Sequence, residues 1–275
     1  MSERRTVAQW LDAIAAELHG VAERPRREAE LLIMEHLGKD QVWLITHQES
    51  IVDNPRRLIE WMLRRKAHEP LEYITNRVSF YSQIFHIEPG ALIPRPETEL
   101  LIDRVLETAD AEQELTIVEV GVGSGVISVV LAQHLPNARI IAVDISEEAL
   151  GVARKNIEAF GLEDRIELRH GSLLGPVKEP IDILVSNPPY IAADAPLERN
   201  LDYEPDLALY GGPIGDEIIR QLLDEIDARR IPVSAFEFGY DQKEKVEAYL
   251  KGREYKSLKF YKDLAGFDRG FVLTY

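Results

Sequence analysis

Strands and helices alternate along residues 116–250, and this alternation restricts the fold more than any other feature of the chain. Short runs of apolar and β-branched residues, such as 116–120 and 181–186, are separated by segments with helical periodicity. Parallel strands need a crossover between them, so this order predicts a mostly parallel sheet with helices on both faces. Two consecutive strand-like runs, near 257–261 and 270–273, predict an antiparallel hairpin at its edge.

The first 70 residues show only helical patterns. Apolar residues recur at helical spacing behind Thr6, where Gln9 can complete a capping box. Pro25 and Gly38 stand where a second helix would begin and end, and the last helical pattern must stop before Pro70. We therefore expect a helical N-terminal domain over 1–70, a hairpin linker over 71–94 and an α/β domain over 95–275.

Composition narrows the classes of function. The formal net charge is −16, from 48 acidic and 32 basic residues, whereas nucleic-acid binding normally requires a basic surface. We therefore expect no stable nucleic-acid partner. The absence of cysteine excludes disulfides and thiolate metal sites, and the seven histidines are too scattered for a metal motif, so we expect no metal. No signal peptide or membrane span is apparent, which predicts a cytoplasmic protein without a membrane partner.

The apolar run 181–186 ends abruptly in the tetrapeptide Asn187, Pro188, Pro189 and Tyr190. In open α/β sheets, ligands bind at the carboxyl ends of the strands. The Asn187 side-chain oxygen and the Pro188 carbonyl can both accept hydrogen bonds, and neither proline has an N–H group to compete. Two acceptors beside an aromatic ring favour a planar group that carries an NH2. A turn that merely ends the strand is the alternative on these residues alone.

A second candidate site follows the strand 116–120. The loop there consists of Gly121, Val122, Gly123, Ser124 and Gly125, and its glycines let a ligand approach the backbone closely. The next strand ends in Asp144 and Ile145, where the acid can accept both hydroxyls of a ribose. Val126 stands where dinucleotide enzymes need a third glycine, and Glu119 suits an ammonium better than a phosphate. These features favour a cationic nucleoside such as S-adenosylmethionine over a structural glycine turn.

Together these motifs resemble a class I S-adenosylmethionine-dependent methyltransferase that methylates amino groups. The segment 92–99, Leu-Ile-Pro-Arg-Pro-Glu-Thr-Glu, is more specific. It is similar to the signature of the bacterial peptide chain release factor glutamine methyltransferases, the PrmC or HemK family. Further similarity lies in Glu204-Pro205, Gly211-Gly212, Glu237-x-Gly239-Tyr240-Asp241-Gln242 and the segment 263–269. The resemblance covers about residues 70–275, and the N-terminal helices match in type and length only.

The resemblance implies a Rossmann-like, seven-stranded class I methyltransferase sheet with an N-terminal helical bundle domain. It implies S-adenosyl-L-methionine as cofactor and, as substrate, the glutamine of the Gly-Gly-Gln motif of class I peptide chain release factors. The N-terminal domain would dock this protein substrate, and we expect the enzyme to be a monomer. Ser172 or Leu173, past the third strand, should border the adenine. By resemblance, Arg95, Pro96, Glu97 and Thr98 close over the cofactor.

Two alternatives remain open, and the chain departs from the family pattern in two places. An adenine methyltransferase acting on RNA or DNA would need the same tetrapeptide together with base flipping. A nucleoside-binding regulatory module without catalysis would need only the glycine loop.

Val122 replaces the usual threonine of that loop, and residues 214–216 are Ile-Gly-Asp where the family tends to show Asp-Gly-Leu. In the glutamine methyltransferase hypothesis, Asn187 and Pro188 orient the substrate amide and Tyr190 stacks on it. Asn187 also borders the cofactor.

Overall fold

The computed structural model describes residues 4–196, 199 and 201–275, which form two compact units. The smaller unit contains the chain up to Arg77 together with the described residues of 198–203, and the larger unit contains the remainder. The division falls after Arg77, so the segment 71–94 is shared between the units. Residues 1–3 of the expected N-terminal domain lie outside the described residues.

The smaller unit is helical. It contains α1 (Val7–Glu17), α2 (Pro25–Leu37), α3 (Gln41–Thr46), α4 (Arg56–Lys66) and α5 (Leu71–Thr75). The capping box of Thr6 and Gln9 is confirmed, and Gly38 ends α2 in the left-handed conformation with φ 63°. Apolar side chains of all five helices, including Leu11, Leu32 and Ile74, meet in one core. The short 3-10 helix Leu201–Tyr203 joins this unit, where the Tyr203 hydroxyl donates to the Ala67 carbonyl over 2.7 Å.

Helix α5 was not expected, because five residues are too few to display helical periodicity. Pro70 precedes it in an extended conformation, and Asn76 ends it with φ 55°. Its two buried residues, Tyr73 and Ile74, explain why the segment becomes helical despite its length. Packing of these side chains stabilises a helix that would be marginal in isolation.

A β-hairpin follows, formed by β1 (Arg77–Phe80) and β2 (Gln83–His86). Its turn residues are Tyr81 and Ser82, whose φ angles of 49° and 59° are typical of a two-residue type I′ turn. The hairpin lies within the linker expected over 71–94. Such turns normally carry Asn or Gly, and neither residue type is present to mark the position.

Contacts with helix α6 (Thr98–Thr108) hold this unusual turn in place. The Tyr81 N–H donates to Glu99 Oε1 over 2.8 Å, and the Tyr81 hydroxyl donates to Asp103 Oδ1 over 2.9 Å. Both acceptors lie on α6, a helix that the sequence analysis missed. Its buried residues, among them Leu101, Ile102 and Val105, repeat at helical spacing and were available as a signal.

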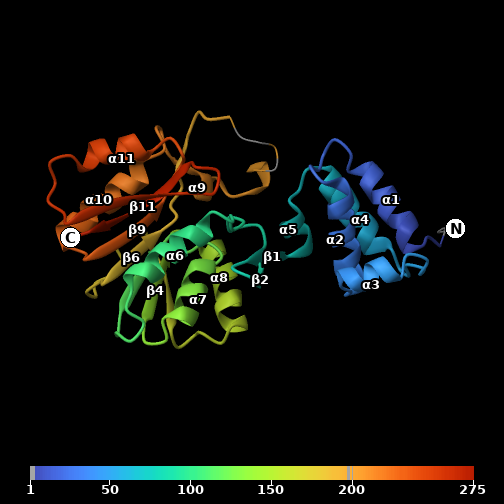
Figure 1. The fold of residues 1–275 in the computed structure, drawn as a ribbon, viewed down its shortest axis with the longest axis horizontal. Helices are drawn as coiled ribbons and strands as arrows, with labels where there is room; N and C mark the ends of the chain where they lie inside the picture. Colours follow the sequence, from blue (N-terminus) through green and yellow to red (C-terminus); the bar gives the residue numbers. More distant parts are fainter. Residues whose placement is uncertain (1–3, 197–198, 200) are drawn as a thin grey trace. The chain divides into compact units, whose positions relative to one another are not determined.

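The larger unit is built on a seven-stranded sheet in the order β10-β11-β9-β6-β3-β4-β5 (Figure 1). The strands are β3 (Thr116–Val120), β4 (Arg139–Asp144), β5 (Ile166–His170), β6 (Ile183–Ser186), β9 (Val233–Glu237), β10 (Ser257–Lys262) and β11 (Asp268–Thr274). Strand β11 pairs antiparallel with both of its neighbours, and the pairs among β9, β6, β3, β4 and β5 are parallel. The predicted seven-stranded α/β fold with its edge hairpin is therefore confirmed.

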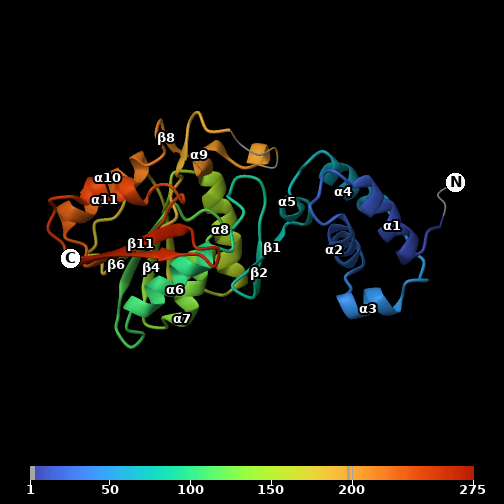
Figure 2. The ribbon, with the colours of Figure 1, turned by 45° about the horizontal axis from the view of Figure 1, so that its top comes forward.

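Helices cover both faces of this sheet (Figures 1 and 2). One face carries α6, α7 (Val126–His134) and α8 (Glu147–Ala159), and the other carries α10 (Glu217–Arg229) and α11 (Lys243–Leu250). The main apolar core lies under α10 and α11, where Val118 and Leu184 of the sheet meet Leu222. Within the described part of the chain, no helix has the length and apolar character needed to cross a membrane.

Candidate active site

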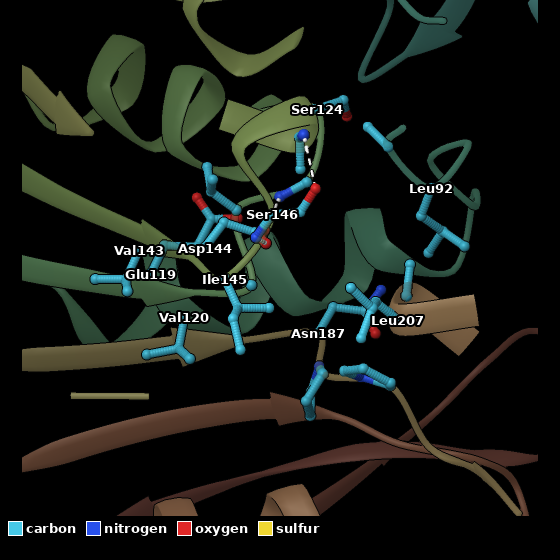
Figure 3. Close-up of a pocket in the computed structure, with 18 of the residues that line it drawn as sticks. Leu92, Glu119, Val120, Ser124, Val143, Asp144, Ile145, Ser146, Asn187 and Leu207 are labelled. Atoms are coloured by element: carbon cyan, nitrogen blue, oxygen red, sulfur yellow. Dashed lines mark hydrogen bonds between the residues drawn. The ribbon is translucent and has the colours of Figure 1, made fainter. Parts of the chain in front are cut away.

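A cavity of ≈ 240 Å³ lies in the larger unit at the carboxyl ends of β3, β4 and β6. The chain proceeds from β3 to β4 on one side and later returns to place β6 on the other, so the strand order reverses here. Such switch points are the usual ligand sites of open α/β sheets. Figure 3 shows Glu119 and Asp144 on one side of this cavity and Asn187, Leu207 and Leu92 on the other.

The glycine loop forms one wall of the cavity. Gly121, Val122, Gly123 and Ser124 line it. The φ angles of Gly121 and Gly123 are 78° and 52°, which glycine adopts without strain. Gly125, also expected to contact the cofactor, does not line the cavity. A Cβ atom at this position would lie 3.2 Å from Ala153 Cα, so Gly125 instead allows α7 to pack closely on α8.

Asp144 is held rigidly at the end of β4. Its Oδ2 accepts from the Gly123 N–H and its Oδ1 from the Ser146 N–H, each over 2.9 Å. Burial raises the pKa of Asp144, while these backbone N–H groups act in the opposite direction. A carboxylate fixed in this way can accept further hydrogen bonds from a diol. Ile145, Ser172 and Leu173 also line the cavity, where Ile145 and Leu173 offer apolar surface to a base.

Glu119, the fourth residue of β3, also lines the cavity but lies in a different environment. It is 1% exposed, and this burial raises its pKa to about 8. The hydrogen bond that the Ser128 hydroxyl donates to Oε2 acts in the opposite direction and lowers the pKa. Its other oxygen, Oε1, has no hydrogen-bond partner among the described residues. A buried carboxylate of this kind is stabilised by a cation. Together with Asp144, it fits a nucleoside that carries an ammonium group.

Asn187 follows β6 and lines the cavity together with Pro188 and Pro189. Its Nδ2 donates to the Thr98 hydroxyl over 3.2 Å, which leaves the side-chain oxygen free to accept. Tyr190 does not line the cavity. Its ring lies beside Gly239, where an added Cβ atom would be 3.3 Å from Tyr190 Cδ2. Burial raises the pKa of the Tyr190 hydroxyl, so it remains protonated.

Contacts to its backbone carbonyl groups fix the conformation of the tetrapeptide 187–190. The Gln242 side chain donates to the Tyr190 carbonyl over 2.9 Å and to the Gly215 carbonyl over 3.0 Å. A Cβ atom at Gly211 would come within 2.4 Å of the Pro189 carbonyl oxygen, and one at Gly215 within 2.5 Å of the Tyr190 carbonyl oxygen. Both positions therefore require glycine. The departure at 214–216 keeps the glycine that this packing needs.

Two segments close the cavity opposite the glycine loop. One contains Leu92 and Pro94, and the other contains α9 (Asp206–Leu209), where Leu207 and Ala208 line the cavity. Glu204 joins the two segments. Its Oε1 accepts from Arg95 Nη2 over 2.5 Å and its Oε2 from the Ile93 N–H over 3.0 Å.

Of the residues expected to close over the cofactor, only Thr98 lines the cavity. Arg95 pairs with Glu204, and Glu97 lies 3.9 Å from the Arg269 guanidinium. Neither these two residues nor Pro96 is among the lining residues. The role of Glu204 was not predicted from the sequence. Its presence within a shared motif was the available signal.

A seven-stranded sheet of this order, with its cavity over the switch point, defines the class I S-adenosyl-L-methionine-dependent methyltransferases. Solved structures share the fold. The ribosomal protein L11 methylase of Lactobacillus delbrueckii subsp. bulgaricus is 23% identical with a TM-score of 0.51, over 68% of this chain and 83% of that one. The hMettl16 catalytic domain, solved with an MAT2A 3′UTR hairpin, is 14% identical with a TM-score of 0.57, over 84% of each chain.

Sequence comparisons are more specific. Residues 96–200 match the methyltransferase small domain, and residues 9–75 match the PrmC N-terminal domain. The release factor glutamine methyltransferase of Koribacter versatilis is 37% identical over 97% of this chain and 98% of its own length. That of Moorella thermoacetica is 37% identical over 99% and 98%. The chain belongs to the release factor glutamine methyltransferase family.

Proposed function

We propose that this enzyme transfers a methyl group from S-adenosyl-L-methionine to the glutamine side-chain amide of the Gly-Gly-Gln motif in class I peptide chain release factors. The observation that carries the proposal is the Asn187 side chain. Its oxygen is available at a cavity that also holds Glu119 and Asp144. The names of the relatives at 37% identity support the same substrate. We further infer a monomer that acts in the cytoplasm without a stable nucleic-acid partner.

Three residues account for cofactor binding. The Asp144 carboxylate would accept the ribose hydroxyls, and Glu119 Oε1 would receive the ammonium of the methionine end. Leu173, which lines the cavity, would cover one face of the adenine. When bound, S-adenosyl-L-methionine supplies an electrophilic methyl group on a sulfonium. Because Glu119 is buried and only partly satisfied, a cation beside it lowers its pKa from about 8 and keeps it ionised.

Catalysis rests on positioning. An amide nitrogen is a weak nucleophile because its lone pair is delocalised into the carbonyl group. No Lys or His is among the described residues that line the cavity, so no strong base is in place. Asn187 Oδ1 and the Pro188 carbonyl accept the two amide hydrogens and turn the nitrogen toward the methyl group. The surplus proton leaves to solvent after transfer.

A transfer assay with tritiated S-adenosylmethionine tests the function. Purified release factor, tRNA and DNA serve as separate acceptors, and a release factor whose motif glutamine is replaced by alanine serves as the matched control. We expect label only in the parent release factor, with peptide mass spectrometry placing one methyl group on the glutamine. Label in adenine of RNA or DNA would favour the alternative substrate class instead. Binding without transfer to any acceptor would favour a non-catalytic module.

We also propose that the smaller unit docks the release factor. Its helices α3 and α4 expose Val42 by 70%, Ile45 by 65% and Leu63 by 55%. Exposed apolar groups of this kind favour a protein partner.

Point substitutions test the docking role without removing the unit. We expect the double substitution Val42→Ser and Ile45→Ser to lower kcat/KM for intact release factor by about tenfold, as for central interface residues. Turnover of a short Gly-Gly-Gln peptide should not change. Tyr255→Ser, at another exposed position (39%) in the larger unit, is the matched control. Equal kcat/KM for intact factor in all three proteins would reduce the helices to a stabilising cap.

A further inference from the structure

Three side chains from separate elements meet behind the acceptor site. Strands β6 and β9 are parallel neighbours, with Ser186 paired to Phe236. The next residue of each strand, Asn187 and Glu237, therefore lies at the same edge of the sheet. Thr98, the first residue of α6, completes the group. Thr98 and Glu237 are each 2% exposed, so this cluster is sealed from solvent.

The NH2 end of the Asn187 side chain points into this cluster. Asn187 Nδ2 donates to the Thr98 hydroxyl over 3.2 Å. Interactions with the Thr98 and Asn187 side chains lower the pKa of the Glu237 carboxyl group, against the effect of its burial. Glu237 Oε2 is buried and has no hydrogen-bond partner among the described residues. A buried acceptor atom of Glu237 is therefore available to the Thr98 hydroxyl and the Asn187 NH2 group.

The orientation of the Asn187 amide decides whether the acceptor site can work. A primary amide can be turned by 180° with almost no change in shape, which exchanges its donor and acceptor ends. With the NH2 end toward the substrate, two NH2 groups would face each other, and neither could accept. An ionised carboxylate can only accept hydrogen bonds. It therefore attracts the NH2 end of Asn187 and repels the oxygen.

We propose that Glu237 is a positioning residue for methyl transfer, which holds the Asn187 amide, with Thr98, so that its oxygen faces the acceptor nitrogen. This role rests on the proposed function. Glu237 does not line the cavity and touches neither the cofactor nor the reacting atoms. It acts through Asn187 alone, and its removal should leave the cofactor site intact.

The role predicts a particular pH dependence. Burial raises the pKa of Glu237 to about 7, Glu97 on α6 adds to this, and Arg269 on β11 opposes it. The hydroxyls of Tyr190 and Tyr261 also face this carboxyl group and stay protonated because burial raises their pKa values. Once protonated, Glu237 can donate to the Asn187 oxygen and favour the wrong orientation. Turnover should therefore fall as the pH drops below about 7.

The substitution Glu237→Gln tests this role at constant shape. We expect kcat at saturating cofactor to fall by at least about tenfold, as for loss of one preorganised contact. S-adenosylmethionine affinity, measured by calorimetry, should stay within about threefold. The acidic limb of the kcat profile should disappear. Thr98→Ser should retain activity, and Thr98→Val should lose it. Ser234→Ala, on the same strand and fully buried, is the matched control with unchanged kcat.

A readout without substrate separates this inference from the proposed function. In the parent enzyme, the side-chain NH2 signal of 15N-labelled Asn187 should exchange slowly with solvent, and Glu237→Gln should accelerate this exchange by about tenfold or more. Unchanged exchange together with unchanged kcat would overturn the positioning role. So would a parallel loss of cofactor affinity. If the parent enzyme labels no release factor while the exchange effect is present, the proposed function fails and the contact stands.

Discussion

Two carboxylates at neighbouring strand ends have different chemistry because their hydrogen-bond partners differ. Asp144 is tied down by two backbone N–H groups, which fix its direction. Glu119 keeps one buried oxygen without a partner among the described residues, and its pKa rises to about 8. The first is suited to a fixed geometry and the second to a counter-ion. Asn187 follows the same logic, since its NH2 end is engaged and its oxygen is left to accept.

At this scale the decisive test is Asn187. Asn187→Ala should lower kcat by about 10²–10³, the typical cost of one preorganised polar contact, with cofactor affinity unchanged. Asn187→Asp keeps the shape but adds a negative charge beside the sulfonium and Glu237. It should preserve or improve cofactor affinity while turnover stays low. Single-turnover kinetics with release factor and calorimetry with S-adenosylmethionine measure the two effects. Turnover of the alanine variant within about threefold of the parent would contradict the mechanism.

At the scale of elements, the cavity depends on a contact between segments that are far apart in the chain. Leu92 and Pro94 on one segment and α9 on the other close the cavity. Glu204, with its side chain 1% exposed, holds the first segment by the Arg95 guanidinium and the Ile93 N–H. Because both bonds involve a buried charge, they are stronger than ordinary surface pairs.

Removal of this contact should loosen the cofactor cavity. We expect Glu204→Ala to weaken S-adenosylmethionine binding by at least about tenfold, since charge-assisted bonds contribute about 1.5–3 kcal/mol each. Hydrogen exchange at residues 92–95 should accelerate at the same time. Glu167→Gln, in an exposed ion pair with Arg139, is the control and should change little. Unaltered affinity in Glu204→Ala would show that apolar packing alone closes the cavity.

For the whole molecule, buried carboxyl groups govern how stability depends on pH. Burial raises the pKa of Glu119 to about 8 and of Glu237 to about 7, from the ordinary value of 4.5. Between pH 4.5 and about pH 8, the folded protein therefore binds more protons at these two groups than the unfolded chain does. The contribution of these two groups to the free energy of unfolding is therefore greatest below pH 4.5 and decreases as the pH rises toward 8. His36 opposes the trend, because burial lowers its pKa.

Denaturant unfolding without cofactor should show this loss. We expect the free energy of unfolding to fall from about pH 5 to about pH 8, by up to about 1.4 kcal/mol per pH unit for each proton released. The double substitution Glu119→Gln and Glu237→Gln should flatten the slope, and Glu167→Gln should not. Saturating S-adenosylmethionine should also flatten it, since a cation beside Glu119 restores the ionised form. A slope that persists in the double variant would assign it to other groups.

Local patterns were sufficient for the architecture and for the residues at the strand ends. Strand and helix periodicity determined the α/β sheet, and the capping box behind Thr6 lies within four residues. The glycine loop, Asp144 and Asn187 could be expected to line one cavity because each lies at or directly after the end of a strand, and parallel strands bring their carboxyl ends to one edge.

Tertiary structure alone decided which partners these residues meet. Thr98 and Asn187 are 89 positions apart, and Ile93 and Glu204 are 111 apart, so no periodicity relates them. Sheet order determines that β9 lies beside β6, and this places Glu237 next to Asn187. Packing likewise assigned Gly125 to the contact between two helices and moved Tyr190 out of the cavity. A side chain's type follows from the sequence, but its partner and charge state depend on neighbours that only the folded chain supplies.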